Sequence, residues 1–501
     1  MAGFTTKFNA LCLFKAFSLS LLIGFVTIGC GGGDGGGGGG DGGTPRGTNG
    51  YTVSFLNGDF QVAYSVGNKS GSNTIAALAA EALVPDSEQI YAVGGVLVNS
   101  DTVNVDRNLD FYLGSVNSNV IEINSSAGFP SADASALSGR YALTSDIDLT
   151  GVTWTPLGTG AGTSRFTGRL NGSGYKIIGL KVNSTSDYIG LFGSIYNAHI
   201  TNLGVEIDGE VKGDEYVGGI VGRVYGASSI TNSYVIGNVR GTNNYVGGIA
   251  GRLEDTASIK NSYTTGNVNG TQYVGGIAGN LEDTASIKNS YFEGNVKATT
   301  DAAGGIAGRL QNTASIKNSY AAGSVNGATR TGGVLGHLNA AGTVVINTYF
   351  IGDVSGTGAY TGGLVGGSDQ GSFKNSYAIG TVHGTTYVGG IAGWGSSAAA
   401  TILQNNVAYS DSVTGTGATN INRAVGGSVN AGVLRNVVRS ALPVGTNSGD
   451  QYSGIGMADN LFKVLETYQT LSWGFEGNDD SPWQINAAKN DGFPYLYWQD
   501  L

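Results

Sequence analysis

Residues 245–270 read YVGGIAGRLEDTASIKNSYTTGNVNG, and residues 273–298 repeat them almost unchanged as YVGGIAGNLEDTASIKNSYFEGNVKA. Related units of about 28 residues occur seven times between residues 216 and 390, and a Gly-Gly pair marks each one. The pairs are Gly218-Gly219, Gly247-Gly248, Gly275-Gly276, Gly304-Gly305, Gly332-Gly333, Gly362-Gly363 and Gly389-Gly390. Self-similarity at this period is typical of a stacked solenoid, in which each unit covers the hydrophobic edge of its neighbour.

Two polar or aromatic positions repeat in step with the glycine pairs. The first is an Asn column: Asn232, Asn261, Asn289, Asn318, Asn347 and Asn375. The second follows two residues later and is a Tyr column: Tyr234, Tyr263, Tyr291, Tyr320, Tyr349 and Tyr377. Because Asn tolerates left-handed backbone and carries both a donor and an acceptor, we expect each Asn at a bend, bonded to the next unit. The tyrosines are candidate ligand contacts that could stack on sugars, and a packed ladder beside the sheet explains them equally well.

The pattern inside one unit predicts an all-β fold. Tyr245–Leu253 is apolar, Glu254–Ala257 is typical of a turn, and Ser258–Tyr263 alternates between apolar and polar residues. Each unit should therefore contain about three short strands and close as one coil of a parallel, right-handed β-helix. Four side chains of the unit should point inward: Val246, Ile249, Ile259 and Val268.

The N-terminus is typical of an exported protein. Lys7 and Lys15 precede the apolar run Phe17–Ile28, as in a secretory signal. The following Thr27-Ile28-Gly29-Cys30 resembles a bacterial lipoprotein lipobox, except that Thr27 stands where that family usually has Leu. The resemblance implies cleavage before Cys30, a lipid on Cys30 and a place in the outer membrane or on the cell surface. An ordinary signal peptide is the alternative.

Composition shifts divide the rest of the chain. The Gly-rich stretch after Cys30 behaves as a flexible tether, and residues 51–118 lack the repeat. Within them Thr74–Leu83 is Ala-rich and predicts a short helix, and the alternating strands around it resemble small β-grasp-like repeats of bacterial surface proteins. A spacer is the preferred role over a binding module. The predicted segments are 1–29 signal peptide, 30–50 tether, 51–118 spacer domain, 119–187 N-terminal cap and first coils, 188–440 β-helix, and 441–501 C-terminal cap.

The two caps should protect the open strand edges of the solenoid from aggregation. In the C-terminal cap, Asn460–Leu471 predicts an amphipathic helix. The tryptophans of this segment should cover the last coil: Trp473, Trp483 and Trp498.

Several motifs together resemble the GLUG-repeat family of bacterial surface proteins. They are Trp154-Thr-Pro-Leu-Gly158, Asn171-Gly-Ser-Gly-Tyr-Lys-Ile-Ile-Gly-Leu180, Tyr188-Ile-Gly-Leu-Phe-Gly193, Tyr245-Val-Gly-Gly-Ile-Ala-Gly251 and Gly492-Phe-Pro-Tyr-Leu496. The resemblance covers residues 119–500 and implies a surface protein of the adhesin type.

Carboxylates are the one serious candidate for chemistry. Glu254-Asp255 and Glu282-Asp283 lie one unit apart, so the two pairs should stack within about 5 Å. Carboxylates this close either raise the pKa of one of them, as catalysis needs, or bind a cation such as Ca²⁺ weakly. A solvated turn that was copied by duplication is the third interpretation of these residues. The three histidines His199, His337 and His383 lie on different units, and no cofactor or zinc motif is recognised.

These patterns favour a non-enzymatic, lipid-anchored adhesin or surface-binding stalk. The membrane is the expected partner through Cys30, and a glycan or an extracellular protein is the expected ligand. The net charge of −10 argues against nucleic acid. A β-helical polysaccharide lyase or hydrolase that uses carboxylates, and a structural scaffold of the envelope, are the alternatives.

Overall fold

The structure is a computed structural model whose described part lies within residues 51–500. It covers residues 51–56, 62–69, 71–82, 84, 90–91, 102–105, 109–113, 120–130, 136–159, 164–396, 401–416, 420–427, 433–442 and 454–500. The predicted signal peptide, Cys30 and the tether lie outside the described residues. No helix among the residues described is long and apolar enough to cross a bilayer.

A small α+β domain precedes the repeats. Its mixed sheet has the order β2-β1-β6-β4, formed by β2 (Val62–Lys69), β1 (Tyr51–Leu56), β6 (Leu109–Leu113) and β4 (Ile90–Tyr91). The central strands β1 and β6 run parallel, and β2 and β4 pair antiparallel at the edges. A second pair joins β3 (Gly71–Thr74) to β5 (Thr102–Val105). The helix predicted at Thr74–Leu83 is α1 (Ile75–Glu81).

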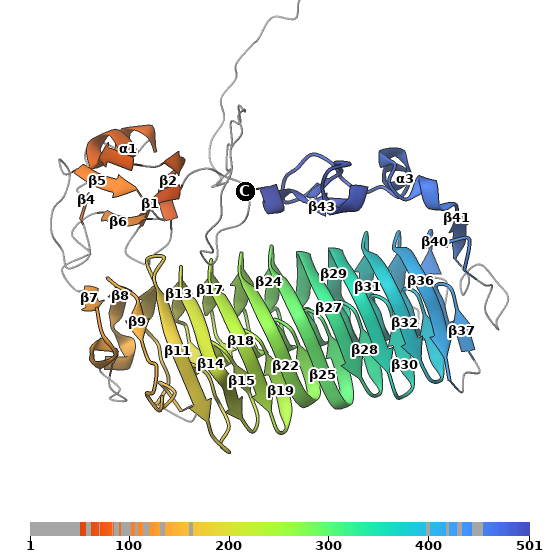
Figure 1. Cartoon of the computed structure of the whole chain (residues 1–501), viewed down its shortest axis with the longest axis horizontal. Coiled ribbons are helices and arrows are strands. Elements are labelled where there is room, and N and C mark those ends of the chain that lie inside the picture. Colours follow the sequence, from red (N-terminus) through yellow and green to blue (C-terminus); the bar gives the residue numbers. More distant parts are fainter. Residues whose placement is uncertain are drawn as a thin grey trace, which may run out of the picture. The chain divides into compact units, whose positions relative to one another are not determined.

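The repeats form a parallel β-solenoid of about 10 turns, as the sequence predicts (Figure 1). Each coil has four strand segments rather than about three, and equivalent segments of successive coils pair in register as rows A, B, C and D. Row A leads into the Asn column. It contains β7 (Val120–Ile123), β8 (Arg140–Leu143), β10 (Arg169–Asn171), β13 (His199–Thr201), β17 (Ser229–Thr231), β21 (Ser258–Lys260), β24 (Ser286–Lys288), β35 (Thr401–Gln404), β39 (Val433–Leu434) and parts of β27 (Ser315–Gly327), β29 (Leu335–Gly356) and β31 (Val365–Lys374).

Row B begins at the Tyr column. It contains β9 (Ile147–Asp148), β11 (Lys176–Asn183), β14 (Gly204–Gly213), β18 (Tyr234–Gly241), β22 (Tyr263–Gly275), β25 (Tyr291–Gly304), β32 (Tyr377–Gly384), β36 (Val407–Gly415), β40 (Val437–Arg439), β41 (Ile455–Met457) and the later parts of β27 and β29. The strands β22 and β25 continue into row C without a break.

Rows C and D meet at the Gly-Gly pairs. Row C contains β15 (Val217–Gly218), β19 (Asn244–Gly247), β28 (Arg330–Gly332), β30 (Tyr360–Gly362), β33 (Tyr387–Gly389) and β37 (Asn420–Asn422). Row D contains β12 (Phe192–Tyr196), β16 (Val221–Tyr225), β20 (Ala250–Leu253), β23 (Ala278–Leu281), β26 (Ala307–Leu310), β34 (Ala392–Gly395), β38 (Val425–Gly427) and the starts of β29 and β31.

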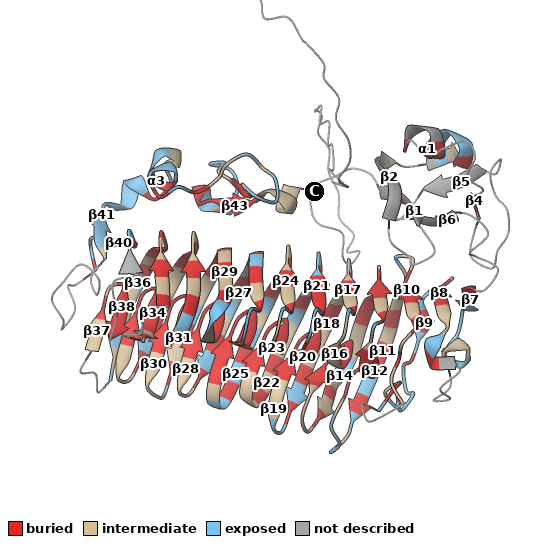
Figure 2. Cartoon of the chain, turned by 180° about the vertical axis from the view of Figure 1, so that it is seen from behind, coloured by how far each residue is buried: buried red, intermediate tan, exposed pale blue. Residues whose placement is uncertain are grey.

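The core runs continuously inside the coils and is mainly aliphatic, with a few phenylalanines such as Phe292 and Phe350. Figure 2 shows buried positions, in red, along the whole stack. Val246, Ile249, Ile259 and Val268 are each fully buried, which confirms the inward face predicted for this unit. Burying one such side chain contributes about 1.5–3 kcal/mol to stability, and the repeat multiplies that gain along the stack.

Close packing explains the Gly-Gly pairs. A Cβ on Gly247 would lie 2.1 Å from the carbonyl oxygen of Ala250, and one on Gly248 would lie 2.2 Å from the carbonyl oxygen of Gly276. Neither residue has a positive φ. The pair is therefore needed for the close approach of backbones at the corner between rows C and D, and not for left-handed backbone.

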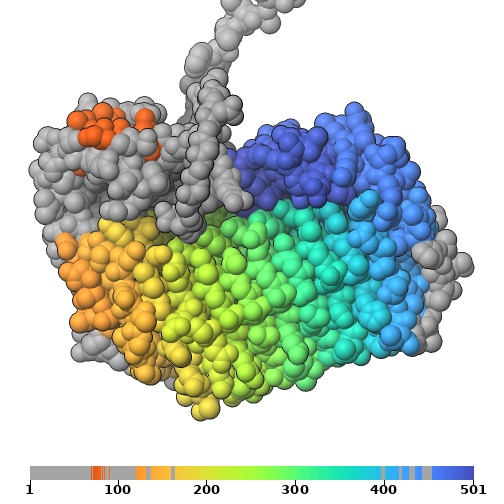
Figure 3. All heavy atoms as spheres, in the orientation of Figure 1, coloured from red at the N-terminus to blue at the C-terminus, as the bar shows by residue number. Residues whose placement is uncertain are grey.

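The C-terminal arm, residues 454–500, begins as the last strand of the stack and then leaves it. After β41 it contains the 3₁₀ turn Asp459–Leu461, α3 (Leu465–Thr470), and an antiparallel pair of β42 (Trp483–Gln484) and β43 (Tyr495–Leu496). The predicted helix is thus shorter than Asn460–Leu471. Figure 3 shows the dark blue arm lying directly against the green and cyan coils.

Candidate functional site

The Asn column lies at left-handed bends, with φ of 49–55°. Asn261 donates from Nδ2 to Oδ1 of Asn232 at 3.1 Å, and Asn347 does the same to Asn318 at 3.1 Å. The ladder is interrupted between these pairs because Asn289 and Asn318 donate instead to Asp479 of the arm, at 3.4 and 3.0 Å. The amides therefore join coil to coil, and two of them also hold the arm.

The Tyr column forms a stack of nearly parallel rings, which we call the arm-side ladder: Tyr234, Tyr263, Tyr291, Tyr320, Tyr349 and Tyr377. Successive ring centroids are 4.7–5.1 Å apart, with interplanar angles of 1–9°. The separation follows from the spacing of about 4.8 Å between paired strands. Burial raises the pKa of Tyr349 and of Tyr377 above the ordinary value of a phenol.

The arm covers much of this ladder, so the prediction that its tryptophans cover the last coil is wrong. Trp498 lies beside Tyr291 and Tyr320, and Trp483 beside Tyr349 and Tyr377. The physical reason is that the ladder offers a long aromatic edge, which buries more apolar surface than a single terminal coil can.

Hydrogen bonds fix the arm along the same edge. Trp473 donates from Nε1 to the carbonyl of Asn405 at 2.9 Å, and Trp498 donates to the carbonyl of Asn318 at 2.9 Å. Tyr377 donates to the carbonyl of Pro494 at 2.7 Å. Every one of these bonds joins an arm residue to a coil far away in the sequence.

This geometry reduces the number of tyrosines in the arm-side ladder that could contact a sugar. The faces of the rings in the ladder lie against one another, so a sugar cannot stack on them between coils. Tyr349 and Tyr377 are 2% and 0% exposed beneath the arm. For these two residues the packed ladder, and not the sugar platform, describes what the side chains do.

A second stack of tyrosines lies at the corner before the Gly-Gly pairs. This arginine-side ladder consists of Tyr188, Tyr216, Tyr245 and Tyr273, with centroids 4.8–5.4 Å apart. All four residues have a positive φ of 53–60°. In the sequence, a tyrosine immediately before Val-Gly-Gly or Ile-Gly marks this ladder. The arginines that flank it come from row D, and the sequence alone does not show that they lie beside these tyrosines.

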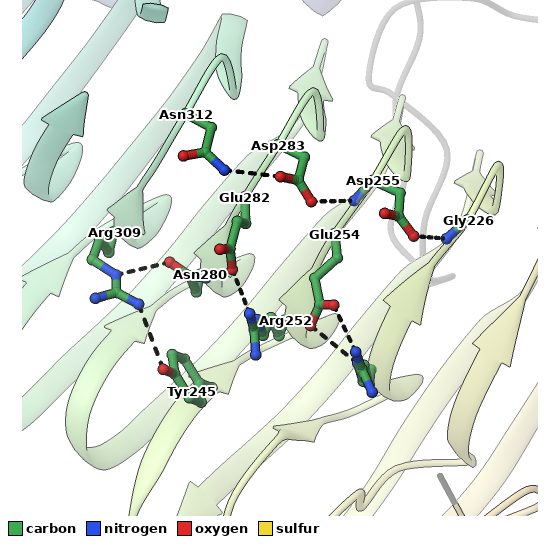
Figure 4. Close-up of polar contacts among 11 residues, drawn as sticks. Gly226, Tyr245, Arg252, Glu254, Asp255, Asn280, Glu282, Asp283, Arg309 and Asn312 are labelled. Carbon is green, nitrogen blue, oxygen red and sulfur yellow. Dashed lines mark hydrogen bonds and ion pairs between the residues drawn. The ribbon is translucent and has the colours of Figure 1, made fainter. Parts of the chain in front are cut away.

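Arginines from row D flank the second ladder, and Figure 4 shows Arg309 reaching Tyr245 of that ladder. Arg223, Arg252, Asn280 and Arg309 follow one another in register. Arg252 lies 5.3 Å from the ring centroid of Tyr245, and Arg309 lies 3.8 Å from that of Tyr273. Such cation–π contacts stabilise the corner and hold the guanidinium groups in place.

The predicted carboxylate site is an ion-pair network. Glu254 accepts from Arg223 at 2.7 and 3.0 Å, and it forms an ion pair with Arg252 at 2.8 Å. Arg252 also pairs with Glu282. Burial alone would lower the pKa of Arg252, but its bond to Glu282 and the charge of Glu254 raise it above its ordinary value. Arginine therefore separates the like charges that the sequence places one coil apart.

The two aspartates point to a different set of partners. Asp255 accepts from the backbone N–H of Gly226 at 2.8 Å, and Asp283 accepts from the backbone N–H of Asp255 at 3.2 Å and from Asn312 at 2.8 Å. Both have left-handed backbone, with φ of 56° and 57°. Within the described ranges no group of three or more His, Cys, Asp or Glu side chains could hold a metal ion.

The histidines have separate partners. His199 contacts Ser229 Oγ at 2.6 Å, and His383 contacts Thr414 Oγ1 at 3.0 Å. Burial lowers the pKa of His337, although its contact with Asp369 at 2.9 Å opposes that shift. The structure does not bring the three rings together.

A shallow polar groove, wide open to solvent, lies over row B on coils near the middle of the chain. It consists of two adjoining hollows of about 550 and 440 Å³ that share Glu210 and Asn269. Asn238 and Asn267 line the first hollow, and Arg240 lines the second. The sequence analysis did not identify this groove, because its residues differ from coil to coil apart from the asparagines.

The GLUG motif matches four tandem stretches of the chain: residues 213–240, 242–269, 270–297 and 300–326. Residues 213–326 of the solenoid therefore carry tandem GLUG motifs, as the resemblance implied. The lipoprotein signal stays a prediction.

One curated relative, provisionally described as a Gly-rich membrane protein of Evansella cellulosilytica, is 41% identical over 97 residues. That match covers 17% of this chain and 11% of the relative. The chain thus matches only a small part of the length of that relative.

Two solved structures resemble the chain in outline. One, from Bacteroides ovatus and provisionally described as an immunoglobulin A1 protease, has a TM-score of 0.36 and 20% identity, and the match covers 75% of this chain and 92% of that chain. The other, an IgA1 protease, has a TM-score of 0.32 and 18% identity, over 68% of this chain and 23% of that chain. Both TM-scores are low, and the fold described above rests on the strand pairings.

Proposed function

We propose that this protein is a non-enzymatic, surface-exposed stalk that binds a glycan or an extracellular protein along the side of its β-helix. The observation that carries the proposal is the groove on row B, where the side-chain amides of Asn238 and Asn267 repeat from coil to coil. A rigid row of evenly spaced hydrogen-bonding groups suits a long ligand and offers it many equivalent contacts. The GLUG repeats, known from surface proteins, support the same reading.

Attachment to the membrane forms the second part of the proposal. Lys7 and Lys15, the apolar run and Cys30 form the order expected of a lipoprotein signal. A lipid on Cys30 and the tether 30–50 would hold the β-helix at the outer membrane or cell surface while leaving its sides accessible.

Catalysis by Glu254 and Glu282 is the weaker alternative. Both carboxylates already pair with Arg252, and Glu254 also pairs with Arg223. Guanidinium groups already bond both carboxylate oxygens of Glu254 and one oxygen of Glu282, the atoms that a general acid or base would present to a substrate. The contacts of these residues therefore support a structural role.

The test uses cells that express the full-length chain and the variant Cys30→Ala. Antibody labelling of intact cells and mass spectrometry of the N-terminal peptide should show a surface protein with lipid on Cys30, and both signals should be lost in the variant. The purified chain is then applied to a panel of polysaccharides, scoring retention and new chain ends. Retention without cleavage supports the proposal, new chain ends favour the carboxylate enzyme, and neither result favours an envelope scaffold.

A further inference from the structure

The groove on row B has an unusual charge for this chain. The protein carries −10 in total, yet the cations Lys181, Arg240 and Lys297 line the two hollows beside a single acid, Glu210. Lys212 lies in register with Arg240, which adds a fourth cation to the same strip. The groove is therefore a basic region on an acidic protein.

Within the described part of the chain, these cations have no carboxylate partner. Lys181, Arg240 and Lys297 are exposed, and no carboxylate among the described residues lies within ion-pair distance of them or of Lys212. The arginines of row D, by contrast, mostly pair with Glu254 and Glu282. Unpaired cations gathered in a groove attract an anionic ligand and raise its local concentration.

Glycines directly precede the asparagines that line the groove. Row B kinks at Gly237, Gly266 and Gly294, whose φ angles are 131°, 140° and 151°. A Cβ on Gly266 would lie 2.1 Å from the carbonyl oxygen of Gly237, and one on Gly294 would lie 1.8 Å from that of Gly266. Only glycine fits these stacked kinks, and the residues that follow two of them, Asn238 and Asn267, line the groove.

The residues after the kinks form a short amide ladder. Asn267 donates from Nδ2 to Oδ1 of Asn238 at 2.9 Å, and Asn295 does the same to Asn267 at 2.8 Å. Asn238 donates from Nδ2 to the carbonyl oxygen of Gly209 at 3.2 Å. A primary amide has two N–H donors, so each of these bonds leaves its asparagine one donor for a ligand. The ladder thus repeats a fixed donor about every 4.8 Å along the groove.

The cations repeat on the same spacing. Lys212, Arg240, Asn269 and Lys297 follow one another in register over four adjacent coils. Neighbouring positive charges are therefore one or two coils apart, about 5 to 10 Å. A linear polymer that carries hydroxyl groups on every unit and regularly spaced anions matches both rows.

We infer that this groove binds an acidic polysaccharide, with Arg240 and Lys297 contacting its anions and the amides of Asn238 and Asn267 contacting its hydroxyl groups. This inference rests on the proposed function and gives its ligand a chemical class. Nucleic acid fits less well, because the described residues that line the groove include no aromatic side chain, and single-stranded binders stack bases on aromatic rings.

The test measures retention of the purified full-length chain on immobilised polygalacturonate, neutral dextran and single-stranded DNA. The double variant Arg240→Gln/Lys297→Gln removes two groove cations. The matched control, Lys260→Gln/Lys317→Gln, removes two exposed cations from row A and changes the net charge equally. Circular dichroism checks that both variants fold.

The wild type should be retained on polygalacturonate and not on dextran, and high salt should release it. The groove variant should lose roughly tenfold in affinity, with the control nearly unchanged. Equal losses in the two variants, equal retention on dextran, or tighter retention on DNA would each overturn the inference. In a second assay, cells that display the groove variant are tested for adhesion to polysaccharide. If they still adhere, the protein binds glycan through another part of its surface, so the proposed function stands and the inference about the groove is wrong.

Discussion

The two tyrosine ladders have the same internal geometry but different surroundings. In the arm-side ladder and in the arginine-side ladder the rings stack at nearly the same separation, because both inherit the step between coils. The C-terminal arm covers the first with tryptophans, whereas cations and carboxylates surround the second. The repeated residues therefore determine that the tyrosine rings stack, whereas residues outside the repeat determine whether the outer edges of the rings are buried or exposed.

The largest effect is expected from removing a tryptophan of the arm that covers the arm-side ladder. Trp483 is fully buried and lies between Trp473, Tyr349 and Tyr377. Trp483→Ala should destabilise the docked arm by about 3–5 kcal/mol, because it leaves a cavity that the rigid ladder cannot close. Limited proteolysis should then cleave the arm while the coils stay protected.

Trp394→Ala is the control for this change. Trp394 is half-buried on row D and lies outside the arm. Its loss should leave the arm as resistant to protease as in the wild type. If Trp483→Ala leaves cleavage of the arm unchanged, the arm is not held by its aromatic contacts.

The second effect acts on the arginine-side ladder. Glu254→Gln removes the charge shared by Arg223 and Arg252, and should destabilise the protein by about 1–3 kcal/mol. Chemical denaturation measures the change. Glu293→Gln is the control, since Glu293 is exposed and, among the described residues, its carboxylate accepts a hydrogen bond only from the Tyr320 hydroxyl, at 3.1 Å. Equal effects of the two substitutions would mean that the ion-pair network adds no stability.

A third change compares one hydroxyl from each ladder. Tyr377→Phe removes a buried O–H that donates to Pro494 and accepts from Asn490 at 2.6 Å, so it should weaken arm docking by about 1–2 kcal/mol. Tyr245→Phe removes a half-buried hydroxyl that lies 3.5 Å from Arg309, and should change stability by less than about 0.5 kcal/mol. Thermal unfolding of both variants provides the measurement, and a larger loss in Tyr245→Phe would contradict the assignment of the buried ladder.

The sequence predicts the repeated part of this comparison and not the rest. Val246 and Ile259 point inward and Asn261 takes left-handed backbone as expected, because one unit contains all the information that its neighbours repeat. The position at which the arm docks depends on pairs such as Trp498 and Asn318, which lie 180 residues apart in the sequence. Trp498 does not belong to the repeat. No local pattern could reveal such a pair.

The surroundings of the carboxylates could not be predicted for a related reason. The sequence correctly places Glu254 and Glu282 on adjacent coils, but the effect of that proximity depends on Arg252, which row D presents between them. The register of row D relative to the following turn is a property of the folded coil. Like charges one coil apart therefore predict a perturbed pair only when no cation lies between them.

The smallest expected effect concerns pH and the arm. Burial alone would raise the pKa of Asp479, but its bonds to Lys288, Tyr497 and Asn289 together hold it below the ordinary 3.8. The ionised carboxylate thus favours the docked arm at pH values above 3.8, and this contribution is lost as the pH falls through the lower value of the docked state. Protease sensitivity of the arm should rise in that acid range. Asp479→Asn should already be more sensitive at neutral pH and should lose the acid step, whereas Asp480→Asn, an exposed neighbour, should keep it. An unchanged acid step in Asp479→Asn would show that another group controls the docking of the arm.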